Sequence, residues 1–305
     1  MGRRPSRTYR LRKEESATEG MRRIALGRAE KAVERLREAP RLEDPSDCIH
    51  GARKDLKKLR AVLRLLRRAL GDDLYRIEND RYREAGRLLS PSRDARVKLE
   101  TLDALRERPG GQLPVAATDE WRELLRAECE QAVDDVRGGG ESLDRAVELI
   151  EAGRERIATW PLRPDSWKLV GPGVGRAYRR GRKAMRKAAE EPSGERLHEW
   201  RKRAKDLWYH LRILHDALPE NLASMLAQVD ELADVLGAHH DSEVLRADLL
   251  GRELPTVPRP ALVDAIAARQ QELAATAFDL GKQLYEIKPK AFRRKMKRGW
   301  KAWRE

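Results

Sequence analysis

Two stretches of the chain place one histidine shortly before a group of positively charged side chains. The first stretch, His50–Arg64, reads HGARKDLKKLRAVLR, and the second, His198–Arg212, reads HEWRKRAKDLWYHLR. The same spacing matches His50, Arg53, Lys54 and Lys57 with His198, Arg201, Lys202 and Lys205. Lys, Arg and protonated His form charge-assisted hydrogen bonds with phosphate groups, so the pattern indicates a surface that binds an anionic ligand.

The first stretch separates apolar from charged residues when it is drawn as a helix that turns about 100° per residue. One face carries a row of leucines, Leu56, Leu59, Leu63, Leu66 and Leu70, which predicts a core face. The four matched positions and Arg64 cluster on the opposite face. Like charges three or four residues apart destabilise a helix unless an anion neutralises them. The alternative is an exposed helix surface, but its repetition in the second stretch favours a function.

Each histidine also has two interpretations. His50 and His198 are either buried or capping residues near a helix start, or residues that contact a ligand. Beside several cations a histidine is mostly neutral at pH 7, whereas a bound polyanion favours its protonated form. Backbone N–H groups near a helix start also suit phosphate.

The positions of these residues depend on a chain that is helical almost throughout. Apolar residues recur with helical periodicity, and no convincing run alternates as a β-strand does. Ser46 or Asp47 is a suitable N-cap for the second helix, and Gly71 ends it. We expect helices over 15–38, 47–70, 73–89, 94–107, 118–137, 141–158, 174–190, 195–217, 220–236, 241–251, 259–286 and 290–303.

The two halves of the chain match beyond the histidine stretches. LLSPSRDARV, residues 88–97, aligns with VLGAHHDSEV, residues 235–244, and pairs Asp94 with Asp241. Matches in the same order at nearly constant offsets predict an internal duplication. We therefore expect an all-α protein, with two antiparallel helical bundles related by a pseudo-two-fold axis. The bundles cover 15–158 and 174–303, the Pro- and Gly-rich residues 159–173 form a linker, and 1–14 form a basic tail.

Composition narrows the possible partners. The chain has 305 residues, of which 38% are charged, and its formal net charge is +14. Such a charge attracts nucleic acid, anionic membranes or polyphosphate. Two cysteines, Cys48 and Cys129, support neither a disulfide framework nor a Cys-rich zinc site and fit a reducing cytoplasm. No apolar run approaches the roughly 18 residues of a membrane span, and the Arg-rich N-terminus lacks the apolar stretch of a signal peptide.

Motifs for catalysis, metals or cofactors do not emerge. His239, His240 and Asp241 are adjacent, so the two histidines point to different sides of a helix, and the first half has Ser92 and Arg93 at the matching places. GPGVG, residues 171–175, is not followed by the Gly-Lys-Ser/Thr of a phosphate loop. With no nucleophile elbow, Walker motif or paired carboxylates, we expect a protein that is not an enzyme and has no metal or cofactor.

The histidine stretches resemble the repeated signature of the CHAD family, the conserved histidine α-helical domain. LHEWRKRAKDLWYHLRILH and IHGARKDLKKLRAVLRLL carry the resemblance, together with RRIALGRAEKA, GRAYRRGRKAM and the C-terminal PKAFRR. It covers about residues 15–303. It implies two pseudo-symmetric helical bundles with a basic surface and pore that bind inorganic polyphosphate, a cytoplasmic location and association with polyphosphate granules.

The resemblance also extends the expected site. CHAD often follows a CYTH triphosphatase domain with Glu-x-Glu-x-Lys; here the nearest string, ECEQA from Glu128, lacks the lysine, so we expect a stand-alone binding module. Arg60 is matched by Trp208, which predicts unequal contributions from the two basic faces. Besides the four matched pairs, the expected polyphosphate-binding residues are Arg60, Arg64, Arg212, Arg22, Arg28, Tyr178, Arg179, Arg182, Lys183, Lys288, Lys290 and Arg293.

Two other functions remain open from the sequence. Nucleic-acid binding would use the same charge, but single-strand binders usually add aromatic stacking platforms, and only Trp200, Trp208 and Tyr209 lie near the basic stripe. A phosphatase or kinase acting on polyphosphate is less well supported, because paired carboxylates and a nucleotide loop are not found.

Overall fold

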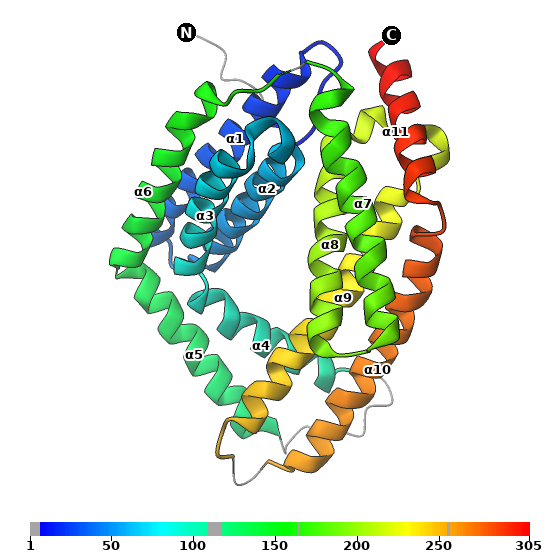
Figure 1. The fold of residues 1–305 in the computed structure, drawn as a ribbon. Coiled ribbons are helices and arrows are strands. Elements are labelled where there is room, and N and C mark those ends of the chain that lie inside the picture. Colours follow the sequence, from blue (N-terminus) through cyan, green and yellow to red (C-terminus); the bar gives the residue numbers. More distant parts are fainter. Residues whose placement is uncertain (1–6, 109–117, 139, 164, 255–256) are drawn as a thin grey trace.

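A computed structural model describes residues 7–108, 118–138, 140–163, 165–254 and 257–305. Within these ranges all regular secondary structure is helical, as the sequence predicts (Figure 1). The first half contains α1 Ala17–Glu38, α2 Ser46–Leu70, α3 Asp72–Leu88, α4 Pro91–Arg106, α5 Asp119–Arg137 and α6 Glu141–Arg156. The second contains α7 Trp167–Glu190, α8 Gly194–Ile213, α9 Met225–Leu250, α10 Arg259–Leu284 and α11 Pro289–Arg304.

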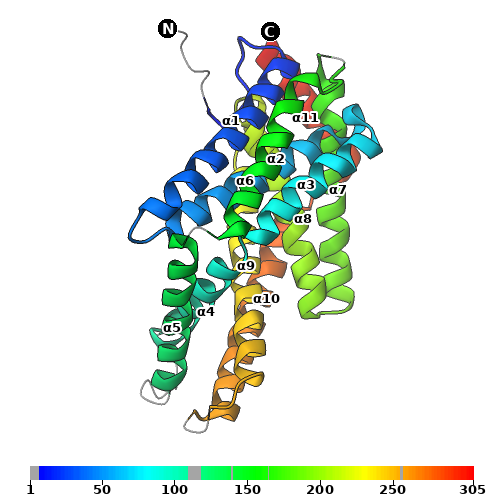
Figure 2. The same cartoon turned by 90° about the vertical axis from the view of Figure 1, so that its left-hand side faces the viewer.

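The helices surround a central space. In Figure 1, α1, α2, α3 and α6 form one side and α7, α8 and α11 the other, while α4, α5 and the lower parts of α9 and α10 close the far end. Figure 2 shows that α4 and α5 project beside α9 and α10. The two sides meet where α2 packs against α7 and α8. The closed arrangement brings residues from both halves of the chain to one interior.

Two hydrophobic cores stabilise this arrangement. The larger core includes side chains from both halves, and the five predicted leucines of α2 are all buried in it. The smaller core joins α4 and α5 to α9 and α10 through residues such as Trp121 and Leu245. Burial of apolar surface contributes roughly 25 cal/mol per Å². The predicted core face of α2 is thus confirmed, and its basic face is directed away from the core.

The predicted linker is too long at its C-terminal end. Helix α7 begins at Trp167, capped by Ser166, so GPGVG lies inside a helix. A side chain at Gly173 would start 2.2 Å from the carbonyl oxygen of Leu65 on α2. Glycine at this position therefore allows two helices to approach closely. The linker prediction was therefore wrong over residues 167–173, which belong to helix α7. Gly173 allows close packing of two helices there and does not mark a flexible segment.

Residues 225–250 form one helix, α9, where we predicted two segments ending at 236 and beginning at 241. In the first half, the chain breaks between α3, which ends at Leu88, and α4, which begins at Pro91 with Ser90 as its N-cap. The aligned position in the second half is Ala238, which continues a helix easily. At the start of α2 the N-cap is Pro45 rather than Ser46 or Asp47, whereas Gly71 ends α2 as predicted, with φ +80°.

Candidate functional site

A cavity of about 1230 Å³ lies between the two sides of the molecule. Helices α2, α8 and α9 contribute most of its described lining, and α3, α4 and α7 add the rest. We call it the central cavity. Nine of the residues expected from the sequence line it: His50, Arg53, Lys54, Lys57, Arg60, Arg64, Arg201, Lys202 and Lys205. The structure therefore brings the basic faces of both histidine helices to one interior.

The described lining of the central cavity is strongly basic. Thirteen Lys and Arg residues contribute to it, against six aspartates and no glutamate. Five of these cations were not predicted from the sequence: Lys58, Arg67, Lys98, Arg180 and Arg203. Arg180 belongs to an acid-free run on α7 that could have identified it, whereas Lys98 lies among acids in the sequence and gives no such signal. The excess of basic over acidic side chains gives the cavity a positive potential that attracts anions.

Two arginines on the basic face of α2 donate to neutral oxygens. Arg53 donates to the hydroxyl of Ser90 at 2.7 Å and to the carbonyl of Gly86, and Arg60 donates to the amide oxygen of Asn79 at 3.1 Å. Burial lowers the pKa of Arg60 to about 10, and that of Lys58 to about 8. Both groups therefore lie in surroundings that disfavour positive charge, which an anion would relieve.

The one acid that α2 carries between His50 and Arg68 turns away from the cavity. Asp55 is fully buried and pairs with Arg28 at 2.9 Å, with Arg35, and with Lys58 at 3.7 Å. This cluster explains Arg28, which the sequence analysis assigned to the binding site. Arg28 lies outside the central cavity, beneath α2, where it neutralises a buried carboxylate.

On α8 the cations alternate with acids. Lys205 pairs with Asp234 of α9 at 2.9 Å, and Arg203 pairs with Glu199 at 2.7 Å. Asp206 contacts Arg64 of α2 at 2.7 Å and so links the two histidine helices across the interior. A second link is buried, where His210 Nε2 lies 3.0 Å from the carbonyl oxygen of Ala61. These contacts fix the distance between the two basic faces.

Two imidazole rings pack against each other at the edge of the cavity, with their planes tilted by 32°. The rings of His198 and His240 have centroids 3.9 Å apart, and His240 lines the cavity. Burial, then the His240 ring and the charges of Lys202 and Arg201, lower the pKa of His198 to about 4. Burial also lowers the pKa of His240. The pair is therefore neutral at pH 7 while no anion is bound.

Residues 7–15, which we call the N-terminal arm, pack under the site rather than extending as the predicted tail. Tyr9 donates to the carbonyl of Lys58 at 3.1 Å and lies edge-on to Tyr209, with centroids 6.2 Å apart. Leu11 is buried and donates from its N–H to the carbonyl of Ile213 on α8. The arm thus supports Lys58 and Tyr209, which both line the cavity. Sequence reasoning missed it because a short basic segment carries no periodic signal.

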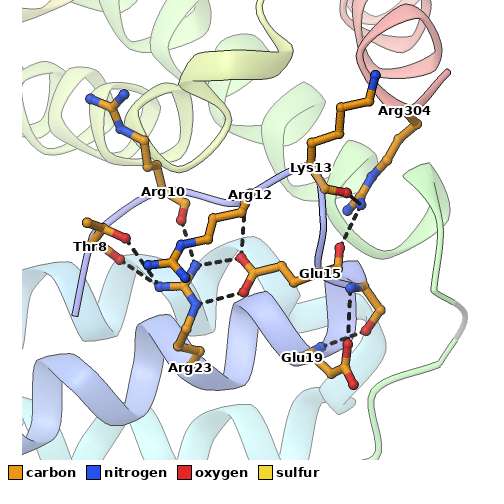
Figure 3. A network of polar contacts seen from close by, with 9 residues as sticks. Thr8, Arg10, Arg12, Lys13, Glu15, Glu19, Arg23 and Arg304 are labelled. Atoms are coloured by element: carbon orange, nitrogen blue, oxygen red, sulfur yellow. Dashed lines mark hydrogen bonds and ion pairs between the residues drawn. The ribbon is translucent and has the colours of Figure 1, made fainter. Parts of the chain in front are cut away.

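Polar contacts attach the N-terminal arm to α1, which follows it, and to α11 at the other end of the chain (Figure 3). Arg23 of α1 pairs with Glu15 and donates to the carbonyl of Arg10 at 2.8 Å. Arg304 of α11 donates to the carbonyl oxygens of Lys13 and Glu15, at 3.1 and 2.6 Å. The arm therefore connects helices from both halves of the chain.

The remaining expected residues lie outside the described lining of the central cavity. Arg22 donates to the carbonyl of Trp160, and Tyr178 is buried, stacked on Phe292 at 4.0 Å. Arg212 lies over the ring of Trp208 at 4.7 Å. His198 packs against the ring of His240, as described above. Of the others, Arg179, Arg182 and Lys183 are carried by α7, Lys290 and Arg293 by α11, and Lys288 is the N-cap of α11.

Neither a metal cluster nor a membrane span is found in the described part of the chain. There, no group of three or more His, Cys, Asp and Glu side chains is placed to hold a metal ion. None of the helices described combines the length and the apolar character needed to cross a bilayer.

Comparisons with known proteins agree with this fold. A family model described as the CHAD domain matches residues 22–250. PptA from Streptomyces chartreusis is similar in structure, with a TM-score of 0.62 and 15% identity over 88% of this chain and 100% of that chain. The CHAD domain from the plant Ricinus communis gives a TM-score of 0.61 and 17% identity over 97% of this chain and 96% of that chain. No curated protein matches.

Proposed function

The chain belongs to the CHAD domain family, and on this premise we propose that its central cavity binds inorganic polyphosphate without reacting with it. The observation that carries the proposal is the unneutralised charge of the cavity. Thirteen Lys and Arg side chains face six aspartates, and burial lowers the pKa of both Lys58 and Arg60. A flexible chain with about one negative charge per phosphate would offset that positive charge. Its many weak contacts would together give a high overall affinity.

Binding without catalysis is part of the proposal. Three of the six aspartates in the described lining are already engaged by cations: Asp206 by Arg64, Asp234 by Lys205, and Asp248 by Lys98 at 2.8 Å. Paired in this way, they are poorly suited to hold the divalent ions that phosphoryl transfer uses. Incubation with polyphosphate and Mg²⁺ or Mn²⁺ should release no phosphate, and a steady release would contradict this part of the proposal.

Nucleic acid is the competing ligand. A single strand gains much of its affinity from stacking on aromatic side chains. In the described lining the aromatic groups are Tyr75, Trp208 and Tyr209, and both Trp208 and Tyr75 already have a cation over the ring. Polyphosphate, which has no bases, needs no stacking platform. Because the cavity is strongly basic and two of these three rings are already covered by a cation, its lining favours polyphosphate over nucleic acid.

Binding measurements over a length series test the proposal. Affinity at fixed salt should rise from pyrophosphate to long polyphosphate and fall as salt is added, because many weak contacts act together. RNA or DNA at matched phosphate concentration should displace labelled polyphosphate poorly. Equal affinity for pyrophosphate and long chains would contradict a multivalent site, and efficient displacement by RNA would favour the nucleic-acid function.

We further propose that the protein acts in the cytoplasm, on polyphosphate granules. Two free cysteines, Cys48 and Cys129, suit a reducing compartment. A fluorescent fusion should overlap with a polyphosphate stain, and it should disperse when the cells are depleted of polyphosphate.

A further inference from the structure

Lys58 contributes its amine to the wall of the central cavity but exposes little of it. The side chain is 17% exposed, and its nitrogen lies 5.8 Å from the centre of the Tyr9 ring in the N-terminal arm. Tyr9 also holds the backbone at this point, since its hydroxyl donates to the carbonyl of Lys58 at 3.1 Å. The arm therefore excludes water from one side of an amine that belongs to the cavity lining.

The one acid beside Lys58 neutralises it only weakly. Within the described ranges its only ion-pair partner is Asp55, at 3.7 Å. That carboxylate is engaged more closely by Arg28, at 2.9 Å, and by Arg35. Because two guanidinium groups already satisfy the carboxylate, the more distant amine gains little attraction from it.

Positive charges from three helices surround the amine. Arg28 of α1 and Arg212 of α8 both lie 5.9 Å from the centre of the Tyr9 ring. Lys58 of α2 approaches the same ring, so three cations surround one aromatic side chain. Lys54 stands one turn earlier on α2 and also lines the cavity. The amine of Lys58 is therefore crowded by like charge as well as desolvated.

Such surroundings make a lysine nucleophilic near neutral pH. Burial lowers the pKa of Lys58 to about 8, against the attraction of Asp55, and the three neighbouring cations add to the shift. A desolvated lysine beside other cations has a substantial neutral fraction, and the neutral amine is the nucleophile. The phenols of Tyr9 and Tyr209 stay neutral in the same pH range because burial raises their pKa values. The positive charge of the cavity also attracts small anionic reagents.

We propose that Lys58 is a site of covalent acylation by acyl phosphates, small anions that carry an acyl group on phosphate. The neutral amine attacks the acyl carbon and forms a C–N bond. The C–O bond to phosphate breaks, inorganic phosphate leaves with the bonding electron pair, and the nitrogen gives its extra proton to water. The product is an uncharged amide, so acylation removes one of the thirteen cations of the described lining.

The acylation site stands apart from the proposed function, whereas its effect on polyphosphate rests on that function. Where polyphosphate binds in the cavity, acylation of Lys58 weakens its binding, and bound polyphosphate shields the amine from acylation. The modification would thus regulate how much polyphosphate the protein holds.

Mass spectrometry of each lysine in the wild-type protein after brief exposure to acetyl phosphate tests the site. Two lysines of the same chain are controls: Lys54, which is exposed in the same cavity, and Lys282, which is exposed on α10 and pairs with Asp279. At about pH 7.5 Lys58 should be acetylated about tenfold faster than either, because a larger share of a desolvated amine is neutral. Its rate should rise with pH and level off above about 8. Acetylation of Lys58 no faster than that of Lys54 or Lys282 overturns the proposal.

A charge variant checks the cause of the reactivity. Arg212→Gln removes one cation from around Tyr9 and should slow the acetylation of Lys58 about threefold, because the amine is then protonated more readily. Arg87→Gln removes an exposed charge of α3 that pairs with Glu84, and as the matched control it should leave the rate unchanged. Equal rates in the two variants would overturn activation by the surrounding cations.

Two further measurements distinguish the site from the proposed function. Lys58→Gln, which imitates the acetylated side chain, should bind polyphosphate about threefold more weakly than the wild type, and Lys58→Arg, which keeps the charge, should bind more tightly than Lys58→Gln. Saturating polyphosphate should protect Lys58 from acetyl phosphate and leave Lys282 reactive. Selective acetylation that polyphosphate does not prevent would support the acylation site and contradict the proposed function. Unselective acetylation of a protein that still binds polyphosphate would do the reverse.

Discussion

Helices α2 and α8 carry the same spacing of one histidine and three cations, and the cations of both line the central cavity, but the partners of these cations differ. On α2, Arg53 and Arg60 donate to neutral oxygens. On α8, Lys205 pairs with Asp234, and Lys202 lies 3.9 Å from Glu199. A cation paired with a carboxylate loses part of its attraction for a ligand. The α2 face should bind the ligand more strongly, because Arg60 donates to a neutral oxygen while the matching position on α8 is Trp208, which carries no charge.

A second difference concerns one ion pair that occurs in both helices with its charges reversed. Asp55 and Lys58 of α2 occupy the positions that Arg203 and Asp206 occupy in α8. On α2 the acid is buried and the cation lines the cavity. On α8 both partners line the cavity, and the acid reaches Arg64 of the other helix. The same position therefore serves stability in one helix and the joining of the two halves in the other.

Replacing these two acids should separate their roles. Asp55→Asn should lower the free energy of unfolding by about 3 kcal/mol, because it leaves the buried guanidinium of Arg28 without its countercharge. Asp206→Asn should lower it by about 1 kcal/mol, because Arg203 keeps Glu199 and Arg64 is partly exposed. Urea unfolding at neutral pH measures both. Equal losses would show that the two acids have equivalent roles.

Removing the cations tests the comparison on the ligand side. Arg53→Ala, Lys54→Ala and Lys57→Ala together should weaken binding of long polyphosphate by about 3 kcal/mol at low salt, since each exposed contact contributes about 1 kcal/mol. The matching set on α8, Arg201→Ala, Lys202→Ala and Lys205→Ala, should lose about 2 kcal/mol, because two of its cations have acidic partners.

The combined variant and the unliganded proteins provide the control. Both sets together should weaken binding more than either alone, because both faces bind one ligand. Without ligand, the melting temperature of each variant should hold or rise, since fewer like charges are stacked. Variants that unfold, or that bind polyphosphate undiminished, would make both faces ordinary exposed helix surfaces.

Helical periodicity made most of the fold predictable. The leucines of α2 identified the face that packs in the hydrophobic core. The opposite, basic face then had to lie outside that core, and it lines the central cavity. Breaks were predicted correctly where Pro or Gly ends a helix, as at Gly71, and wrongly where Gly173 instead allows α7 to approach α2. Local sequence does not distinguish a glycine that ends a helix from one that permits close packing. The internal duplication stays a prediction, which superposition of the two halves would test.

The candidate site was predictable only in part. A pattern on one helix identifies its basic face, so His50, Arg53 and Lys57 were found. Contacts between distant segments leave no such pattern. Arg28 looked like a binding residue because its partner Asp55 is 27 residues away, and Tyr9 was missed because its support of Lys58 depends on the fold.

The histidines should give the smallest effect, and one that depends on pH. The folded-state pKa of His198 is about 4, below its usual 6.5, and that of His240 is also lowered. The folded protein therefore binds fewer protons than the unfolded chain as the pH falls from about 6.5 towards 4. Stability is present above this window and is lost within it. Arg201 and Lys202 oppose protonation of the pair, and Glu199 favours protonation of His198.

Replacing both rings should flatten this dependence. Between pH 7 and 5 the variant His198→Asn/His240→Asn should lose about 1 kcal/mol less stability than the wild type, a modest figure because solvent screens partly exposed groups. Affinity for polyphosphate should change in the opposite direction. A bound polyanion favours the protonated rings, so the wild type should gain about threefold more affinity than the variant on acidification. His215→Asn, which alters an exposed histidine paired with Asp216, is the matched control and should behave as the wild type. If the double variant and the wild type respond to pH identically, the histidine pair takes no part in binding, and its role is confined to packing between α8 and α9.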